Sequence, residues 1–324
     1  MAACFAEVLL LPFGCRLVAV GIALAEAGSI PKYCSAGRPP SFFLTAMLKP
    51  SFVVLTTAAP DDDPTLAYAA ALAAPLGATL HLVHVVSMPP IATLEYGLPL
   101  LDTSYVPAVR DGLRLAAARL PVPTTVQVLE DDWHEALAQV LAAYQPALLL
   151  AGITATDGPF DELLSNRALP LAHQTGYPLL LVPQYLPAAA QRPPRHLLLA
   201  VEDQPFRLTP PTRALAPLLD ALACTITPLT VLPLHHPLAT GEAGLLAAQT
   251  CGLAAALPGA KLHRVVGVRP ATGIWQAADE LGADLVALLD QGHGWAHKLF
   301  SGSVIADVLR YSQVPVLLLP VATD

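Results

Sequence analysis

The sequence predicts an α/β protein built from two tandem, doubly wound domains, each with a five-stranded parallel sheet. From Pro50 onward, short apolar runs alternate with Ala/Leu-rich segments of helical character, which is typical of βαβ units. Several of the apolar runs are nearly continuous stretches of Val and Leu, as expected of strands that are buried on both faces of a sheet. The same order of elements then occurs a second time, so the chain contains two copies of one unit.

The first copy is predicted to contain five strands separated by four helices. Asp and Ser residues stand near the expected helix starts, where their side chains can accept hydrogen bonds from free backbone amides. The strands are expected at about 52–57, 79–86, 124–129, 146–151 and 177–182, with helices starting near Asp62, Ser104, Asp131 and Asp161.

The second copy is predicted to repeat this order of elements after a Pro- and Ala-rich linker at 187–194. The linker separates a first domain at 47–186 from a second domain at 195–324. Strands are expected at about 196–201, 225–232, 261–266, 283–289 and 314–319, and helices at about 209–222, 240–256, 270–281 and 301–312.

The repeat is clearest where the two copies align without a gap. Residues 146–183 align with 283–320 at a constant offset of 137, and prolines bracket the same short apolar strand in both segments. Leu on Leu matches can arise from composition alone, but the paired prolines are harder to explain in that way. We interpret the two copies as products of a duplication.

The first 46 residues differ from the rest of the chain. They contain three of its five cysteines, and Glu7 precedes their apolar segment, where a secretory signal would have a positive charge. We expect Met47 to be the functional start and 1–46 to be disordered or a start-site artefact; a genuine extension is the alternative. The remaining cysteines, Cys224 and Cys251, form no CxxC pair, so the sequence predicts no disulfide framework and a reducing, cytoplasmic compartment.

Composition argues against nucleic acid and membranes as partners. The formal net charge is -8, and no run of Lys and Arg suits a phosphate backbone or an anionic lipid surface. The mean hydropathy is high, at +0.55, but Pro, Gly or charged residues interrupt the apolar runs before they reach the roughly 18 to 20 residues that span a bilayer.

One loop of the second copy has the composition of a phosphate-binding segment. Gly292 is followed after nine residues by Gly302 and Ser303, at the expected start of a helix. Glycines let a backbone approach a phosphate closely, and the free amides of a helix N-terminus donate to its oxygens. Such a loop follows a strand at the carboxyl edge of a parallel sheet, where doubly wound folds bind ligands.

This loop resembles the signature of the universal stress protein family: Gly, two residues, Gly, nine residues, Gly, then Ser or Thr, followed by a helix and a Val-Pro-Val-Leu strand. Three of four positions match, because Leu289 stands where the first glycine belongs. The resemblance covers roughly residues 50–320 and implies the adenine-nucleotide-binding type of α/β domain. It also implies that the last strands, 177–182 and 314–319, pair about a pseudo-twofold axis.

The resemblance implies an adenine nucleotide site in the second copy. Glu202, with Asp203 beside it, would lie toward the ribose, and Val231 would flank the adenine. The amides near Gly292 and Gly302 and the Ser303 hydroxyl would bind phosphates. Asp290, which begins the loop, is included among the binding candidates.

The first copy departs further from the signature, and we do not expect it to bind ATP. It keeps Gly152 but has Ser165 and Asn166 at the later Gly and Ser positions, and Ala58 at the acidic position. Bulkier side chains would hinder backbone approach to a phosphate.

The predicted function is a cytoplasmic, stress-response sensor whose second domain binds ATP or a related adenine nucleotide, with Mg²⁺ on the phosphates if ATP binds, and no catalytic residue is predicted. The alternative is a dimerisation or adaptor protein that binds no nucleotide. A slow ATP hydrolase would need a base, for which the loop offers Asp290 or His293. An intrachain pseudo-dimer is expected, and further homo-oligomerisation is left open.

Overall fold

The computed structural model describes residues 49–56, 63–86, 104–153, 171–232, 240–291 and 304–322. The chain divides into two compact units, Met1–Met47 and Leu48–Asp324, and every described residue belongs to the second. The predicted extension at 1–46 and the helix start near Asp161 lie outside the described residues.

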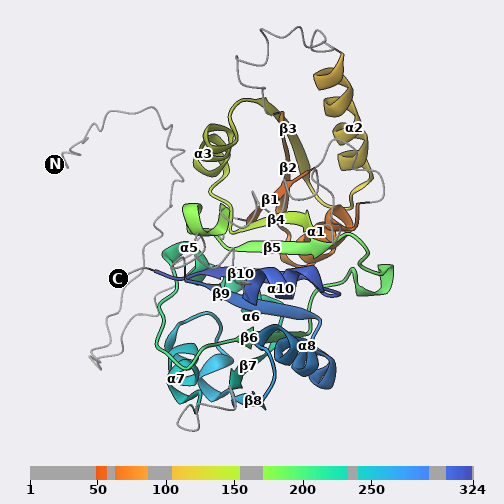
Figure 1. Ribbon diagram of the computed structural model, residues 1–324. Helices are drawn as coiled ribbons and strands as arrows, with labels where there is room; N and C mark the ends of the chain where they lie inside the picture. The colour runs from red at the N-terminus through yellow and green to blue at the C-terminus, as the bar shows by residue number, and fades with distance from the viewer. Residues whose placement is uncertain are drawn as a thin grey trace, which may run out of the picture. The chain divides into compact units, whose positions relative to one another are not determined.

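Ten strands form one continuous sheet in the order β3-β2-β1-β4-β5-β10-β9-β6-β7-β8 (Figure 1). The two copies have the same strand arrangement. In each copy the first strand lies between the second and the fourth strand of that copy, so β1 lies between β2 and β4, and β6 lies between β7 and β9. The strands are β1 (Ser51–Leu55), β2 (Thr79–Val86), β3 (Thr124–Glu130), β4 (Leu148–Ile153), β5 (Leu179–Pro183), β6 (His196–Ala200), β7 (Thr225–Leu232), β8 (His263–Val266), β9 (Leu285–Asp290) and β10 (Val316–Pro320).

The two halves of the sheet join through the last strand of each copy. All other neighbouring strands are parallel, whereas β5 and β10 are antiparallel, with Leu180 opposite Leu317 at the centre of the pairing. Both leucines are buried. The predicted meeting of the last strands is therefore confirmed, and it covers a sheet edge that each copy would otherwise expose.

Helices cover both faces of the sheet, as a doubly wound fold requires (Figure 1). One face packs against α1 (Pro64–Ala73), α2 (Tyr105–Arg119), α6 (Ala216–Ala221) and α7 (Glu242–Thr250), and α5 (Pro210–Arg213) precedes α6 in the chain. The other face packs against α3 (Trp133–Tyr144), α8 (Pro270–Leu281), α10 (Val304–Arg310) and the helical residues 171–175.

The strands alternate their side chains between two hydrophobic cores. In β10, Leu317 and Leu319 belong to the core under α1 and α6, and Val316 and Leu318 belong to the core under α8 and α10. Each core contains residues from both copies. Burial on both faces explains why these strands read as apolar runs without alternation.

Two helices of the second copy are shorter than predicted. The segment at 209–222 forms α5 and α6 instead of one helix, because Pro217 has no N–H to donate to the carbonyl one turn earlier. The segment at 240–256 is helical in α7 only to Thr250, and Gly252 follows with a φ of 74° that a continuing helix does not allow. In the first copy, Asp63 and Asp132 cap α1 and α3, one residue after the predicted starts near Asp62 and Asp131.

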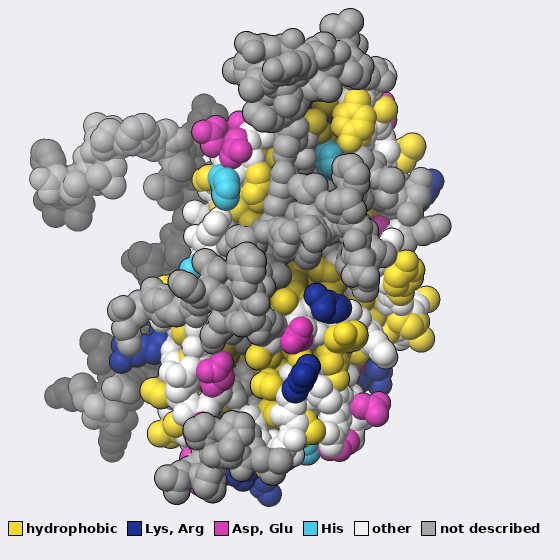
Figure 2. Space-filling model, in the orientation of Figure 1, with side chains coloured by type: hydrophobic (Ala, Val, Ile, Leu, Met, Phe, Trp, Pro, Cys, Tyr) yellow, Lys and Arg dark blue, Asp and Glu magenta, His cyan; other side chains and the backbone are white. Residues whose placement is uncertain are grey.

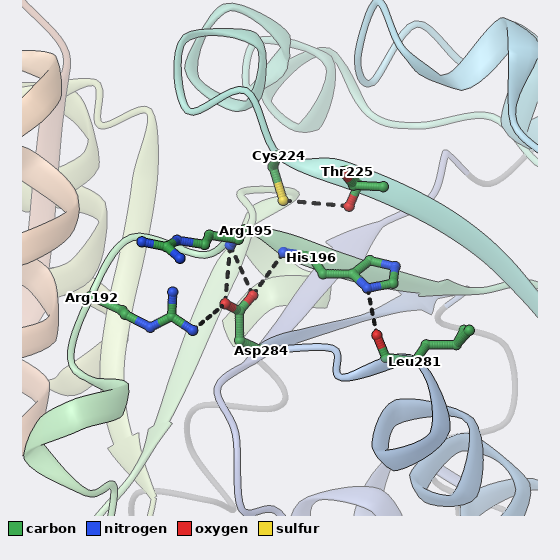
Figure 3. Close-up of polar contacts among 7 residues, drawn as sticks. All are labelled: Arg192, Arg195, His196, Cys224, Thr225, Leu281 and Asp284. Atoms are coloured by element: carbon green, nitrogen blue, oxygen red, sulfur yellow. Dashed lines mark hydrogen bonds and ion pairs between the residues drawn. The ribbon is translucent and has the colours of Figure 1, made fainter.

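Asp284, which precedes β9, holds the linker to the start of β6 (Figure 3). Its carboxylate accepts hydrogen bonds from the backbone N–H groups of Arg195 and His196, each at 2.9 Å, and pairs with the Arg192 guanidinium at 3.3 Å. The His196 Nδ1 donates to the Leu281 carbonyl at 2.9 Å. The second copy therefore begins at a fixed place beside β9.

Replacing a leucine at the junction should destabilise the whole chain. We expect Leu317→Ala, in a side chain that is 3% exposed, to lower the free energy of unfolding by about 2–5 kcal/mol through lost burial and an unfilled cavity. The matched change Leu115→Ala, in a side chain of α2 that is 63% exposed, should alter it by about 0.5 kcal/mol or less. Urea denaturation measures both, and equal effects would show that the junction contributes little.

Candidate functional site

The carboxyl edge of the second sheet half brings three of the predicted residues to one level. Ala200 of β6 is paired with Leu229 of β7 and with Leu288 of β9. Two residues further along each of these segments stand the predicted residues Glu202, Val231 and Asp290. From β6 the chain proceeds to β7 on one side, while β9 lies on the other, so this is the topological switch point at which such folds bind ligands.

Glu202 is exposed and belongs to a short hydrogen-bonded chain. The Gln204 Nε2 donates to the Glu202 Oε2 at 2.7 Å and to the Gln291 Oε1 at 2.9 Å. Gln204 follows β6 and Gln291 follows β9, so this carboxamide links the two loops that border the switch point. Neither glutamine belongs to the site predicted from the sequence, although each directly follows a predicted acidic residue, Asp203 or Asp290.

Asp203 binds the protein backbone. Its two carboxylate oxygens accept hydrogen bonds from the N–H groups of Thr240 at 2.9 Å and Ala243 at 3.2 Å, at the start of α7. The backbone donors of Gly241, Thr240 and Ala243, with the charge of Arg264, lower the pKa of Asp203. The Arg264 Nε also donates to the Thr240 carbonyl at 2.8 Å. Asp203 therefore positions the N-terminus of α7 beside the candidate site.

Two glycines let helices approach the ends of β6 and β7 closely. A Cβ on Gly244 of α7 would lie 2.0 Å from the Glu202 carbonyl oxygen, and one on Gly273 of α8 would lie 2.8 Å from the Val231 Cγ1. Val231 is half-buried and packs into the core under α8. Helix packing therefore fixes the backbone of Glu202 and the side chain of Val231.

Asp290 has a different environment from Glu202. It is the last residue of β9, pairs with Pro320 of β10 and is 1% exposed. Its carbonyl accepts a hydrogen bond from the Val321 N–H at 2.9 Å. Asp290 thus lies within the edge of the sheet, whereas the Glu202 side chain is open to solvent.

The predicted phosphate loop is not part of the described structure. Gly292, Gly302 and Ser303 lie outside the described residues, as does His293, the alternative candidate for a base. The elements on either side have the predicted order, because β9 ends at Asp290 and α10 begins at Val304.

The corresponding edge of the first copy has a different chemistry. The described residues that follow β1 and end β4, Thr56 and Ile153, are uncharged. The Thr56 hydroxyl donates to the Val83 carbonyl at 3.2 Å, and the His84 Nδ1 donates to the Thr56 carbonyl at 2.8 Å. Ala58, Ser165 and Asn166 lie outside the described residues.

Charged side chains are scattered over the described surface seen in Figure 2. Basic and acidic groups stand singly among hydrophobic and neutral side chains on this face. Among the described residues, no cluster of three His, Cys, Asp or Glu side chains could hold a metal ion. The described helices are also too short or too polar for any of them to span a bilayer.

Comparison with known proteins gives one family. The model of the universal stress protein family matches residues 51–183 and again 194–320. No curated protein sequence matches the chain.

Solved structures share the fold at low sequence identity. A universal stress protein from Archaeoglobus fulgidus DSM 4304 is 15% identical with a TM-score of 0.58, and the match covers 85% of this chain and 97% of that one. A functionally unknown protein from Pseudomonas aeruginosa PAO1 is 17% identical with a TM-score of 0.52, covering 85% and 93% of the two chains.

Removing the Asp203 carboxylate should loosen α7 in a pH-dependent way. Because the folded pKa is lowered, the ionised carboxylate stabilises the fold above its unfolded pKa of about 3.9, and this stabilisation is lost as pH falls through the folded pKa. We expect the difference in urea midpoint between the protein and Asp203→Ala to be constant from about pH 7 to pH 5 and to shrink below about pH 4. Asp279→Ala, at an exposed position of α8, controls for loss of a surface aspartate. If the difference in urea midpoint between the protein and Asp203→Ala did not change with pH, the ionised Asp203 carboxylate would not be what stabilises the start of α7.

Proposed function

The chain belongs to the universal stress protein family, and from this premise we propose that its second copy binds an adenine nucleotide as a sensor in a cytoplasmic stress response. The observation that supports the proposal most is the common level of Glu202, Val231 and Asp290 at the switch point. An exposed carboxylate beside an apolar side chain, at this edge of a parallel sheet, suits a ribose next to a base.

Each described residue has a separate role in this proposal. The Glu202 carboxylate accepts hydrogen bonds from ribose hydroxyls, and Val231 provides apolar contact for the adenine. Asp203 acts indirectly, by holding the start of α7 through Thr240 and Ala243. Asp290 supports the end of β9, from which the loop to α10 departs.

The phosphates are assigned to the loop that the structure does not describe. By the family signature, backbone amides near Gly292 and Gly302 and the Ser303 hydroxyl would bind them, and Mg²⁺ would neutralise part of their charge when ATP is bound. The described residues fit the nucleoside half of such a ligand, because they offer an exposed carboxylate and a half-buried apolar side chain at one level.

A second candidate is an adaptor protein that binds no nucleotide. The hydrogen bond of 2.7 Å between Gln204 and Glu202 favours it, because the carboxylate already has a partner within the protein. A nucleotide would have to displace that amide or bind beside it. A slow hydrolase has less support, since Asp290, the one base candidate among the described residues, is buried.

Titration calorimetry with ATP and Mg²⁺ tests the proposal. We expect one site per chain, and we expect Glu202→Gln to weaken binding about tenfold because it removes a charged hydrogen-bond acceptor. Glu135→Gln, at an exposed position of α3 in the first copy, is the matched control and should leave the affinity unchanged. Gly302→Val should abolish binding, since its side chain would block the approach of a phosphate.

Three results would lead to different conclusions. Binding that needs both Glu202 and Gly302 supports the sensor, and no binding by the unaltered protein supports the adaptor. Release of ADP during the titration would instead indicate hydrolysis.

A further inference from the structure

A groove of about 1090 Å³ lies beside the switch point, between the segment that follows β6 and helix α7. Residues within 204–213 form one side, α7 forms another with Leu246 and Ala247, and Gln291, Val321 and Ala322 also line it. Ligand sites of small molecules have volumes of roughly 300–1000 Å³, so the groove is large enough for one.

The charged side chains of the groove have one sign. Among the described residues that line it, these are Arg207 and Arg213, and neither an Asp nor a Glu is present. The chain as a whole has 25 acidic and 17 basic residues, so a purely basic lining runs against its composition. This charge suits an anion, because guanidinium groups bind carboxylates and phosphates well.

The rest of the lining is mainly apolar. Phe206, Leu208 and Leu246 line the groove, and the Leu246 side chain is 63% exposed although it is large and hydrophobic. Carboxamides of Gln204 and Gln291 and the Thr250 side chain add a few polar groups. An apolar lining with a few polar groups is typical of small-molecule sites.

The groove is separate from the proposed nucleoside contacts. Gln204 and Gln291 line it, whereas Glu202, Asp203, Val231 and Asp290 do not. Gln204 donates to Gln291 at 2.9 Å and to Glu202 at 2.7 Å, so the groove adjoins the exposed Glu202 carboxylate without including it.

We propose that this groove binds a small amphipathic anion, a molecule with one carboxylate or phosphate head and an apolar tail of about eight carbons. The Arg213 guanidinium binds the head. Phe206, Leu208 and Leu246 cover the tail and remove its apolar surface from water.

Titration of the full chain with three probes tests the head and the tail. Nonanoate and octyl phosphate share an eight-carbon tail and differ in their anionic head, and 1-octanol has the same tail with no charge. We expect at least one anion to bind at one site per chain and 1-octanol to bind about tenfold more weakly or not at all. The preferred anion shows which head Arg213 selects. Equal binding of 1-octanol, or no binding of either anion, would overturn the proposal.

Paired variants locate the binding. We expect Arg213→Gln and Leu246→Ser each to weaken binding of the preferred anion about fivefold to tenfold. Arg310→Gln on α10 and Leu115→Ser on α2 are matched controls, since Leu115 is as exposed as Leu246, at 63%. Urea denaturation checks that all four variants fold. If the groove variants bind as the controls do, the anion occupies another place and the proposal is wrong.

Cys251 provides an independent readout, because it lines the groove and is only partly buried. We expect the bound anion to slow alkylation of Cys251 by N-ethylmaleimide, measured by peptide mass spectrometry, without slowing alkylation of Cys224. Unchanged labelling of Cys251 in the presence of saturating anion would also overturn the proposal.

Discussion

The antiparallel pairing of β5 with β10 is the interaction on which the rest of the structure depends. It places two leucines, Leu180 and Leu317, opposite each other in the middle of a ten-stranded sheet and leaves neither copy with a free fifth strand. Because the helices of both copies pack on this one sheet, each hydrophobic core contains residues of both. The first copy therefore supports the second structurally, whether or not it binds a ligand of its own.

Three acidic residues at one edge of the second sheet half have three different environments. Glu202 is exposed and is bound by an amide, Asp203 holds the start of α7, and Asp290 is buried at the end of β9. Close contacts at Gly244 and Gly273 fix the backbone and side chains around them. Gln204 connects the proposed nucleoside contacts with the proposed anion groove, because it donates to Glu202 and also lines the groove.

Most of the sheet could be predicted from the sequence, because buried strands appear as apolar runs whatever their partners are. The interruptions in the segments at 209–222 and 240–256 depend on single residues, Pro217 and Gly252, whose local effect outweighs the helical composition around them. The positions of Glu202, Val231 and Asp290 at one level follow from the strand order. The role of Asp203 and the link through Gln204 do not, because their partners are 37 and 87 residues away in the sequence.

Denaturation followed separately in each copy tests the central claim, that the junction makes the two copies one cooperative unit. Trp133 lies on α3 of the first copy and Trp275 on α8 of the second. The chain has a third tryptophan, Trp295, so variants that keep only Trp133 or only Trp275 of the three report on each copy by fluorescence. A single unit predicts that the two urea transitions coincide in midpoint and slope. Unfolding of one copy at a clearly lower urea concentration than the other would contradict the account.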